Sequence, residues 1–587
     1  MWTAPFVLLD DARTGGAPAR LYRRPVRIVR ADTPDAVRPA LAALRNGLAE
    51  GLHAAGMMTY EAGIALAPRP IEHAGAGAAP LLWFGLFDSY TSIVADAVPG
   101  LLPDPAGAWV GAPQPHVDRA TYDARIARIL ALIAAGDIYQ ANLTFAATVP
   151  FAGDPIALYA RLRRQARAGY GALIATGDET WLSLSPELFF GLEGDRLTCR
   201  PMKGTAPRGA TADADRRLAD ALAADPKQRA ENLMIVDLMR NDLSQVAHAV
   251  TVPDLFTVET YPTVHQMTST VTARLNPGRD AVDVIGALFP CGSITGAPKQ
   301  RAMEIIAEVE PGRTRGIYTG AIGCLDPGGD ATFNVAIRTL TVRQGEAVMG
   351  LGSGIVADSV ADQEWQECLD KAAFVTAGQR PLDLIETMAF DPDHGVLRLE
   401  LHLARLTASA RAFGFAFDRH SVRNELQAAT FRLRSARRIR LVVAASGAVA
   451  IEVGPVPESP AGIEVAVVPL PVAPGDIRLR HKTSDRRFYD AAREAAGRFE
   501  VVFEDPDGFL TEGSFTSLFV PRNGVLVTPP AGRLLPGVLR AELLATGQAV
   551  EGRLRRADLA GGFYMGNAVR GLIPAVVAVA KSGHRGV

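Results

Sequence analysis

The feature that most constrains this chain is a short break near residue 380, where one folding pattern ends and another begins. The break, TAGQRPLD at residues 376–383, carries the Gly and Pro residues that interrupt helices and strands. The chain has 587 residues, enough for about four units of roughly 150 residues each. We therefore expect an N-terminal part over 1–110, a domain over 111–376, a linker over 377–382 and a further domain over 383–587.

Composition narrows the class of protein. The hydrophobic fraction of 48% and the charged fraction of 21% are those of an ordinary globular protein. The net charge of -2 offers no basic surface for nucleic acid or an anionic membrane. No signal peptide is apparent, no apolar stretch approaches the ~20 residues that span a bilayer, and the four cysteines lack metal-ligand spacing. We expect a cytoplasmic protein without nucleic-acid or membrane partners.

Helices and strands alternate in both parts of the chain. Residues 117–137 place Tyr122, Ile126 and Ile129 at helical spacing, and the strand-like run IYQANLTFAATV follows. After the break, a strand LIETMAF precedes a helix LHLARLTASARAFG and two β-rich segments, RIRLVVAAS and VAIEVGPV. The fold class is therefore expected to be α/β (α+β) throughout.

Lysine is rare, since only six of the 61 Lys and Arg residues are lysines. Arginine stays protonated in proteins, whereas a partly buried lysine can lose its proton and become a nucleophile, a base or a Schiff-base former. Lys203, in RPMKGTAPRG, and Lys482, in RHKTSDRRFYDAAREA, are the two candidates. Composition alone leaves the solvated surface cation as the simpler interpretation of each.

Acidic residues come from three separate segments of the first part. SPELFF supplies Glu187, and the helical run QRAENLMIVDLMRNDL supplies Glu231. A second helical run, DQEWQECLDKAAFV, places Glu364, Glu367 and Lys371 on one face. Carboxylates from separate elements suit a hard divalent ion such as Mg²⁺, although a row of acids is also typical of a solvated helix face.

These segments form an ordered set that resembles the chorismate-utilising enzymes over about residues 115–375. The family implies a two-sheet α/β sandwich with helices outside and the active site between the layers. The motifs that carry the resemblance are GDIYQANL, LSPELFF, RPMKGTAPRG, RAENLMIVDLMRNDL, PCGSITGAPKQRAMEII, YTGAIG, NVAIRTL and GSGIVADSVADQEWQECLDKA.

Two positions separate the branches of this family. Isochorismate and salicylate synthases carry a lysine where this chain has Gln140, and anthranilate synthases usually carry alanine where it has Lys203. The sequence PMKGT resembles the aminodeoxychorismate synthases, which implies that Lys203 attacks the chorismate ring and Glu187 protonates the leaving hydroxyl. Ammonia then displaces the lysine. The resemblance also implies Mg²⁺ ligands Glu231, Glu364 and Glu367 and substrate-binding residues Thr205, Tyr318, Arg338, Gly354 and Lys371.

The second part contains a different set of chemical groups. Thirty residues after Lys482, LTEGSFTSLFV supplies Glu512, and RLLPGVLRAELLA opens a helix whose amides could bind a phosphate. A pyridoxal phosphate (PLP) site needs at least three groups: a lysine, an acid that contacts the pyridinium nitrogen, and a helix start that binds the phosphate.

The motifs HLARLTASARAFGF, HKTSDR, TEGSFTSLF, LLPGVLR and GNAVRGLIPA resemble the fold-type IV PLP enzymes, which have two subdomains. This group includes branched-chain and D-amino acid aminotransferases and aminodeoxychorismate lyase. Transaminases often place hydroxyls where this chain has Leu539 and Gly566, which favours the lyase. The resemblance implies Lys482 as the cofactor-bound lysine and base, with cofactor-binding residues Glu512, Arg405, Val538, Leu539 and Asn567.

A chain that both makes and consumes aminodeoxychorismate would produce 4-aminobenzoate for folate synthesis. Three alternatives stay open: an anthranilate synthase-like first part, an aminotransferase-like second part, and a chorismate-binding scaffold without catalysis. No cysteine has glycine on both sides, as the G-x-C-x-G elbow of an amidotransferase requires. We therefore expect ammonia to come from a separate glutamine amidotransferase subunit. A homodimer through the PLP domain is also compatible with the resemblance.

Overall fold

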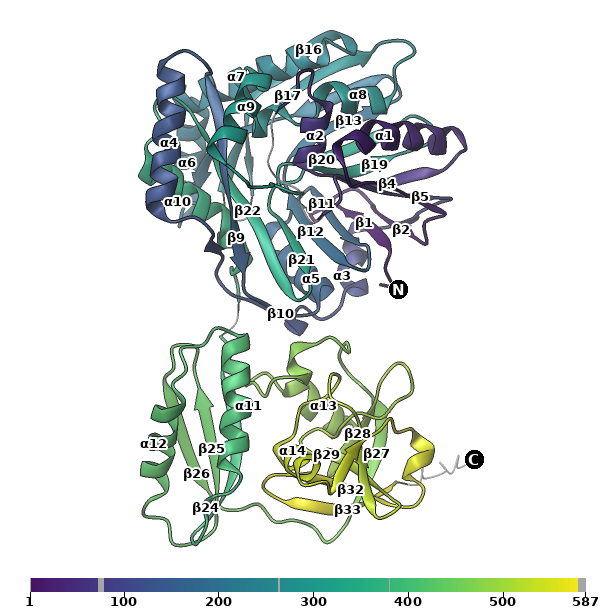
Figure 1. Ribbon diagram of the computed structural model, residues 1–587, viewed down its shortest axis with the longest axis vertical. Helices are drawn as coiled ribbons and strands as arrows, with labels where there is room; N and C mark the ends of the chain where they lie inside the picture. Colours follow the sequence, from purple (N-terminus) through teal and green to yellow (C-terminus); the bar gives the residue numbers. More distant parts are fainter. Residues whose placement is uncertain (1, 72–78, 262–263, 380, 579–587) are drawn as a thin grey trace. The chain divides into compact units, whose positions relative to one another are not determined.

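The computed structural model describes residues 2–71, 79–261, 264–379 and 381–578, and it divides into two compact units (Figure 1). The predicted linker includes Arg380, which lies outside the described residues, as does part of the predicted N-terminal region. The first unit comprises Met1–Leu102, Ala112–Pro150 and Tyr159–Gly378, and the second comprises Pro103–Gly111, Phe151–Leu158 and Gln379–Val587. The chain therefore enters the second unit twice before residue 379.

Two ten-stranded sheets form the frame of the first unit. The first sheet has the order β18 (Gly296–Ala297), β9 (Gln140–Val149), β22 (Glu346–Ile355), β21 (Thr339–Arg343), β12 (Glu179–Ser185), β11 (Tyr170–Ala175), β1 (Phe6–Asp10), β2 (Ala19–Arg23) and β6 (Thr91–Ile93), with β8 (Gln114–Pro115) beside β9. The second has the order β15 (Met202–Pro207), β17 (Val264–Leu275), β14 (Arg196–Arg200), β13 (Leu188–Glu193), β20 (Ala331–Val335), β19 (Ala321–Leu325), β4 (His53–Met58), β5 (Leu82–Phe87) and β3 (Arg27–Ala31), with β16 (Ala247–Thr260) beside β17.

The two sheets pack face to face, which confirms the predicted sandwich. An apolar cluster between them takes Tyr22 and Trp181 from the first sheet and Met57 and Trp83 from the second. All four side chains are at most 2% exposed, so this layer excludes water.

Helices cover the outer faces, and polar residues start several of them. Asp118 accepts a hydrogen bond from the Thr121 amide and caps α4, and Asp225 caps α7, which begins at Pro226. These helices are α1 (Pro34–Ala49), α2 (Tyr60–Leu66), α3 (Val98–Leu101), α4 (Arg119–Ala134), α5 (Pro155–Ala166), α6 (Ala212–Ala224), α7 (Pro226–Leu243), α8 (Ala281–Leu288), α9 (Lys299–Val309) and α10 (Ala361–Ala372).

The second unit has the two predicted subdomains (Figure 1). A four-stranded sheet with helices α11 (Leu399–Ala412) and α12 (Arg419–Thr430) forms one of them. Its strands, in order, are β24 (Gly395–Val396), β23 (Leu384–Asp391), β25 (Arg437–Val443) and β26 (Val449–Gly454).

The other subdomain is a seven-stranded sheet with helices α13 (Arg487–Ala496) and α14 (Val538–Ala545). Its strands, in order, are β28 (Glu500–Glu504), β27 (Ile463–Pro469), β33 (Gly571–Val577), β32 (Phe563–Asn567), β29 (Ser517–Arg522), β30 (Val525–Thr528) and β31 (Ala549–Glu551). A further two-stranded sheet of β7 (Ala108–Val110) and β10 (Phe151–Gly153) also belongs to the second unit.

Candidate active sites

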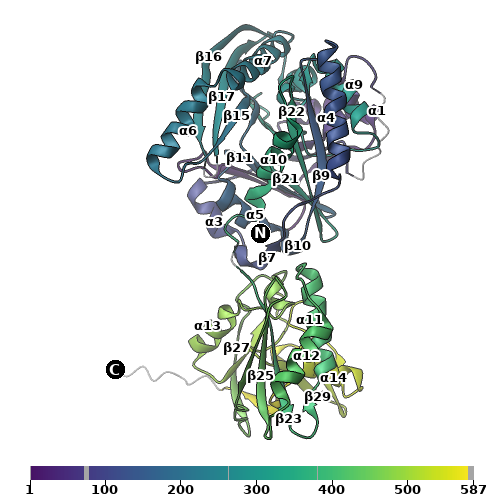
Figure 2. The same cartoon turned by 90° about the vertical axis from the view of Figure 1, so that its left-hand side faces the viewer.

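The first unit contains a polar pocket of about 240 Å³ that opens between its two sheets. Its walls come from β15 and α7 on one side and from β22 and α10 on the other (Figure 2). All ten residues predicted for chorismate chemistry line this pocket, so the fold brings the complete predicted set together. They are Glu187, Lys203, Thr205, Glu231, Tyr318, Arg338, Gly354, Glu364, Glu367 and Lys371.

The amine of Lys203 reaches across the pocket from β15 to β22. A Cβ atom added at Gly354 would lie 2.7 Å from Lys203 Nζ and 3.0 Å from Gln140 Nε2, so both polar groups meet at this glycine. Burial lowers the pKa of Lys203, and the negative charges of Glu231 and Glu367 oppose that change without cancelling it. A lowered pKa increases the fraction of neutral, nucleophilic amine.

Glu187 lies beside this amine on the turn between β12 and β13. Its side chain is 3% exposed, and Ser293 donates a hydrogen bond from Oγ to Glu187 Oε1 at 2.7 Å. Burial raises the pKa of Glu187 to about 7, against the lowering effect of that hydrogen bond. A carboxyl that is still protonated near neutrality can act as a general acid. The sequence had placed Ser293 only within the motif PCGSITGAPKQRAMEII, without a role of its own.

The three predicted metal ligands face the same pocket with different partners. Ser359 donates to Glu364 Oε1 at 2.6 Å, and Lys371 pairs with Glu367 at 2.5 Å. Burial raises the pKa of Glu231, with the neighbouring carboxylates contributing. Within the described ranges, no three His, Cys, Asp or Glu side chains are already gathered as a metal site. The donor chemistry fits Mg²⁺, because a divalent cation would relieve this buried negative charge.

Positive and hydroxyl groups also line this pocket. In the described part of the chain, Arg338 has no ion pair, and burial lowers its pKa. Burial also raises the pKa of Tyr318 to about 12, so its hydroxyl remains a proton donor. Lys371 donates to the Gly352 carbonyl at 3.0 Å. An unpaired guanidinium beside these donors suits a carboxylate ligand.

Gln266, on β17, binds the part of β15 that directly follows Lys203. Its Nε2 donates to the Gly204 carbonyl at 2.9 Å, and its Oε1 accepts from Thr205 Oγ1 at 3.1 Å. His265 lies outside the pocket lining, where it bonds Asp215 at 2.9 Å and Thr260. The amide of Gln266 therefore takes part in the pocket, and the neighbouring imidazole does not.

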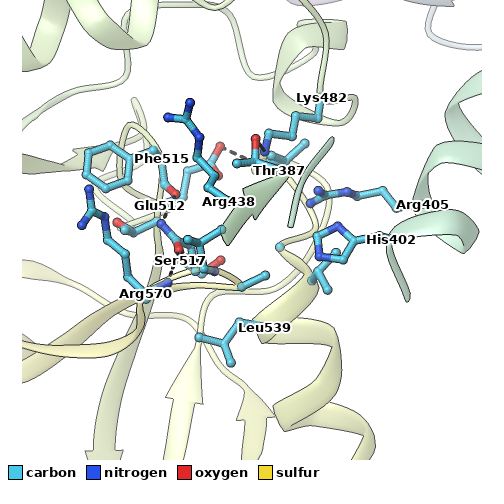
Figure 3. A pocket seen from close by; sticks show the side chains of 18 of the residues that line it. Thr387, His402, Arg405, Arg438, Lys482, Glu512, Phe515, Ser517, Leu539 and Arg570 are labelled. Carbon is cyan, nitrogen blue, oxygen red and sulfur yellow. Dashed lines mark hydrogen bonds between the residues drawn. The ribbon is translucent and has the colours of Figure 1, made fainter. Parts of the chain in front are cut away.

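The second unit contains a pocket of about 220 Å³ lined by both of its subdomains. The six residues predicted to bind a cofactor all line it: Arg405, Lys482, Glu512, Val538, Leu539 and Asn567. Figure 3 shows Lys482 above Glu512, with Arg405 and His402 approaching from one side.

The side chain of Lys482 lines the second pocket, and both its hydrogen bond and its lowered pKa favour reaction of the amine. Its Nζ donates to Thr387 Oγ1 at 3.1 Å. Burial is the main cause that lowers the pKa of Lys482 to about 7, with Arg405 contributing to the decrease and Glu386 opposing it. About half of the side chains are therefore neutral near pH 7, which suits both covalent attachment of an aldehyde and proton transfer. Thr387 was not predicted, since a threonine in a strand gives no chemical signal.

Glu512 offers one free oxygen to the pocket. Its Oε1 accepts hydrogen bonds from Tyr489 Oη at 2.6 Å and from the Leu535 amide at 3.0 Å. Burial raises the pKa of Glu512 to about 7. Among the described residues nothing bonds Oε2, which leaves that oxygen for a ring nitrogen of the cofactor. Tyr489 was also missed, because it is separated from Glu512 by 23 residues.

The opposite end of the pocket suits a phosphate. The helix α14 starts after Gly537, which gives no side-chain cap, so its first amides, Val538 and Leu539 included, are free to bind an anion. A Cβ atom at Gly537 would lie 2.4 Å from Ser517 Oγ, and only glycine leaves this cradle open. Together with Glu512, the donor set fits pyridoxal phosphate.

Arg405 stands beside this helix start. It forms a bidentate ion pair with Glu386, with hydrogen bonds of 2.8 and 2.6 Å, and donates a hydrogen bond to the Pro536 carbonyl at 3.0 Å. Asn567 has a structural task as well, since its Oδ1 accepts from the amides of Val569 and Arg570. Asn567 thus shapes the pocket wall in addition to lining it.

Residues 16–377 match the family model for chorismate binding enzymes. The chain belongs to the chorismate binding enzymes. Residues 383–577 match the model for class IV amino-transferases, so the chorismate-binding part is followed by a fold-type IV domain.

Two curated relatives each match a little under half of this chain. Aminodeoxychorismate synthase component 1 of Salmonella typhimurium is 46% identical over 45% of this chain and 58% of its own length. Anthranilate synthase component 1 1 of Haloarcula marismortui is 43% identical over 44% of this chain and 55% of its own length. The chain therefore spans little more than half the length of these relatives.

A solved structure supports the assignment of the fold. Anthranilate synthase component I from Streptococcus pneumoniae is 25% identical, with a TM-score of 0.53 over 64% of this chain and 93% of that structure. Within the described residues, no helix has the length and apolar character needed to cross a membrane.

Proposed function

We propose that this chain makes 4-aminobenzoate in two steps, one in each pocket. The first pocket would aminate chorismate with ammonia to give 4-amino-4-deoxychorismate, and the second would eliminate pyruvate from that product. The observation that carries the first step is the lysine amine of lowered pKa beside a carboxyl of raised pKa. The Salmonella relative, whose name is that of an aminodeoxychorismate synthase, supports this assignment.

In the first pocket, Lys203 adds through its neutral amine to ring carbon 2 of chorismate. The hydroxyl at carbon 4 leaves as water with the proton of Glu187. Ammonia then adds at carbon 4, and the bond to Lys203 breaks, which regenerates the amine. The new ammonium group at carbon 4 returns a proton to Glu187, which restores the general acid. Arg338, with the hydroxyl of Tyr318, would hold substrate carboxylates.

Glu231, Glu364 and Glu367 would hold Mg²⁺ in the first pocket. The ion, when bound, draws electron density from the ring through the carboxylate it contacts. Because Glu367 is paired with Lys371, we expect this ion pair to open when the cation binds.

In the second pocket, Lys482 would remove the proton from ring carbon 4, and Glu512 would hold the cofactor ring nitrogen. The amides of Val538 and Leu539, together with Arg405, would hold the phosphate. Pyridoxal phosphate, when bound, supplies an electron sink for the carbon that loses the proton. Release of pyruvate then leaves an aromatic ring, which makes the elimination strongly favourable. A transaminase is the competing assignment, because the domain model is that of class IV amino-transferases.

One incubation tests both steps. Purified protein is supplied with chorismate, Mg²⁺, ammonium and pyridoxal phosphate, and the products are separated by chromatography and mass spectrometry. We expect equal amounts of 4-aminobenzoate and pyruvate. Formation of 2-aminobenzoate would instead make the first pocket an anthranilate synthase. Amino-group exchange between amino acids and 2-oxo acids would make the second a transaminase. No turnover of chorismate would favour a binding scaffold.

The Salmonella relative is named as component 1, which supports a separate partner for ammonia supply. We propose that a glutamine amidotransferase subunit fills this role for the present chain. A homodimer through the class IV domain is also proposed, and measurement of the molar mass in solution by light scattering would test it.

A further inference from the structure

Two segments inside the range of the chorismate model pack in the second unit. Pro103–Gly111 and Phe151–Leu158 contribute β7 and β10, which pair antiparallel with Trp109 opposite Ala152. Both side chains pack against the apolar cluster that α11, β23 and β25 share. Chain that precedes the class IV match therefore completes the core of that domain.

Trp109 is the first of three aromatic side chains that contact one another edge-on. The last of them, His481, directly precedes the reactive lysine. The ring of Trp109 meets Phe413 edge-on at 5.2 Å, and Phe413 meets His481 at 4.7 Å. His481 directly precedes Lys482 and is fixed by a hydrogen bond between Nδ1 and Ser409 Oγ at 3.0 Å. Burial lowers the pKa of His481 to about 4, so the ring is neutral near pH 7 and packs as an aromatic group.

Asp104 provides a second link between the segment Pro103–Gly111 and the residues that precede Lys482. It accepts a hydrogen bond from the Ala106 amide at 2.9 Å, which orients its carboxylate, and pairs with Arg478 at 2.7 Å. Arg478 is 4% exposed, lies four residues before Lys482, and also pairs with Asp476 at 2.6 Å. A charge pair of this kind restrains the buried guanidinium, because an unpaired buried charge is costly.

The backbone of β10 touches this segment directly. A Cβ atom at Gly153 would lie 2.5 Å from Ile477 Cγ2 and 2.3 Å from the Gly107 carbonyl. Ile477 belongs to the helical turn Ile477–Leu479 that leads to the lysine. Gly153 has φ +108°, a conformation that also favours glycine.

We propose that β7 and β10 form a positioning element for the second pocket, which fixes residues 476–482 and thereby aims Lys482. Trp109 and Asp104 do not line that pocket, so they act through Phe413 and Arg478. The proposal rests on the proposed function only in taking Lys482 as the reactive amine. It makes the class IV site dependent on chain that lies outside residues 383–577, the range of the class IV match.

The test uses the full chain loaded with pyridoxal phosphate. Trp109→Ala should lower kcat for conversion of aminodeoxychorismate by at least about 10-fold, because small misplacements of a reacting group slow its chemistry. KM should change by less than about twofold, since the pocket lining is intact. Trp109→Phe should restore most of the loss. Asp104→Asn should give a smaller loss in the same direction, and the fold should be kept because Arg478 retains its pair with Asp476.

Two further measurements separate this proposal from the proposed function. In cofactor-free protein, hydrogen exchange of residues 476–486 should be faster in both variants than in the parent chain. In loaded protein, the pH at which the visible absorbance of the bound cofactor changes should shift. Controls are Phe431→Ala and Asp393→Asn, which remove exposed groups of the same unit. Unchanged exchange, titration and kcat would overturn the positioning role. A parent chain inactive on aminodeoxychorismate would refute the function alone, because exchange and titration still report on Lys482.

Discussion

At the scale of single residues, the scarcity of lysine has a chemical explanation. Lys203, Lys227 and Lys371 line the first pocket and Lys482 lines the second, so four of six lysines face the two pockets. Arginine serves as the surface cation elsewhere, and Lys299 is paired with Asp242. Because guanidinium stays protonated, it cannot replace an amine that must attack or accept a proton.

Replacement of the first reactive lysine tests this argument. Lys203→Arg keeps a cation and Lys203→Ala removes it, but neither supplies a neutral amine. Both should lower formation of aminodeoxychorismate from chorismate and ammonium by at least about 10³-fold. Lys299→Arg is the matched control, because its ion pair with Asp242 needs only a positive charge. Normal product formation by Lys203→Arg would remove the lysine from the mechanism.

The pKa of Glu187 predicts the pH dependence of the first pocket. Since burial raises it to about 7 and a general acid must carry its proton, kcat should fall as the pH rises through about 7. Ser293→Ala removes a hydrogen bond that lowers the pKa, so the falling limb should move to higher pH. The measurement is a pH profile of chorismate amination. A limb that does not move in Ser293→Ala would contradict the assignment.

The second pocket should respond to pH in the opposite direction. Burial lowers the pKa of Lys482 to about 7, so the neutral amine becomes more abundant as the pH rises through that value. The rate at which cofactor-free protein captures pyridoxal phosphate should rise accordingly, followed by visible absorbance. Thr387→Val removes the hydrogen bond to Nζ and is the variant for comparison. Capture independent of pH would show that the amine is not the attacking group.

At the scale of helices and strands, local patterns predicted several elements correctly. The helix expected over residues 117–137 is α4, and its three indicated residues, Tyr122, Ile126 and Ile129, are buried. Periodicity suffices there because one face of the helix packs on β9. The placement of β7 and β10 could not be predicted, because three-residue strands carry no period and their partners lie far along the chain.

The residues of the two pockets also divide into those that local sequence predicts and those that depend on distant contacts. Reactive residues such as Lys203 were identified by type and motif, whereas Ser293, Thr387 and Tyr489 act through contacts with residues distant in sequence. A hydroxyl has many roles in proteins, so its residue type alone indicates none of them.

The strand β22 gives a prediction at this scale. In Gly354→Ala, the new methyl group would lie 2.7 Å from Lys203 Nζ, which can move because it ends a flexible side chain. We expect about a 10- to 100-fold loss of chorismate amination with little change in thermal stability. In Gly350→Ala the methyl group would lie 2.0 Å from the ring of Tyr318, so that variant should unfold at a lower temperature. Equal activity of Gly354→Ala and the parent would contradict the placement of the amine.

At the scale of the whole molecule, the two units are built from stretches of chain that alternate along the sequence. The first unit is interrupted by two segments that belong to the second, so no single cut separates them in sequence. Expression of residues 383–587 alone would leave Arg478 without Asp104 and Phe413 without Trp109. The joined chain is therefore the form in which both pockets should be studied.

The four cysteines bear on the source of nitrogen for the proposed amination of chorismate. An amidotransferase nucleophile is a thiolate, which needs an accessible cysteine of lowered pKa. All four cysteines are buried, and burial raises the pKa of each thiol: Cys199, Cys291, Cys324 and Cys368. We therefore expect the purified chain to use ammonium and not glutamine. Glutamine supplied free of ammonium should yield neither glutamate nor aminodeoxychorismate, while added ammonium should restore amination in the same tube. Glutamate release by the chain alone would refute this, since it would require a nucleophile that these buried thiols cannot provide.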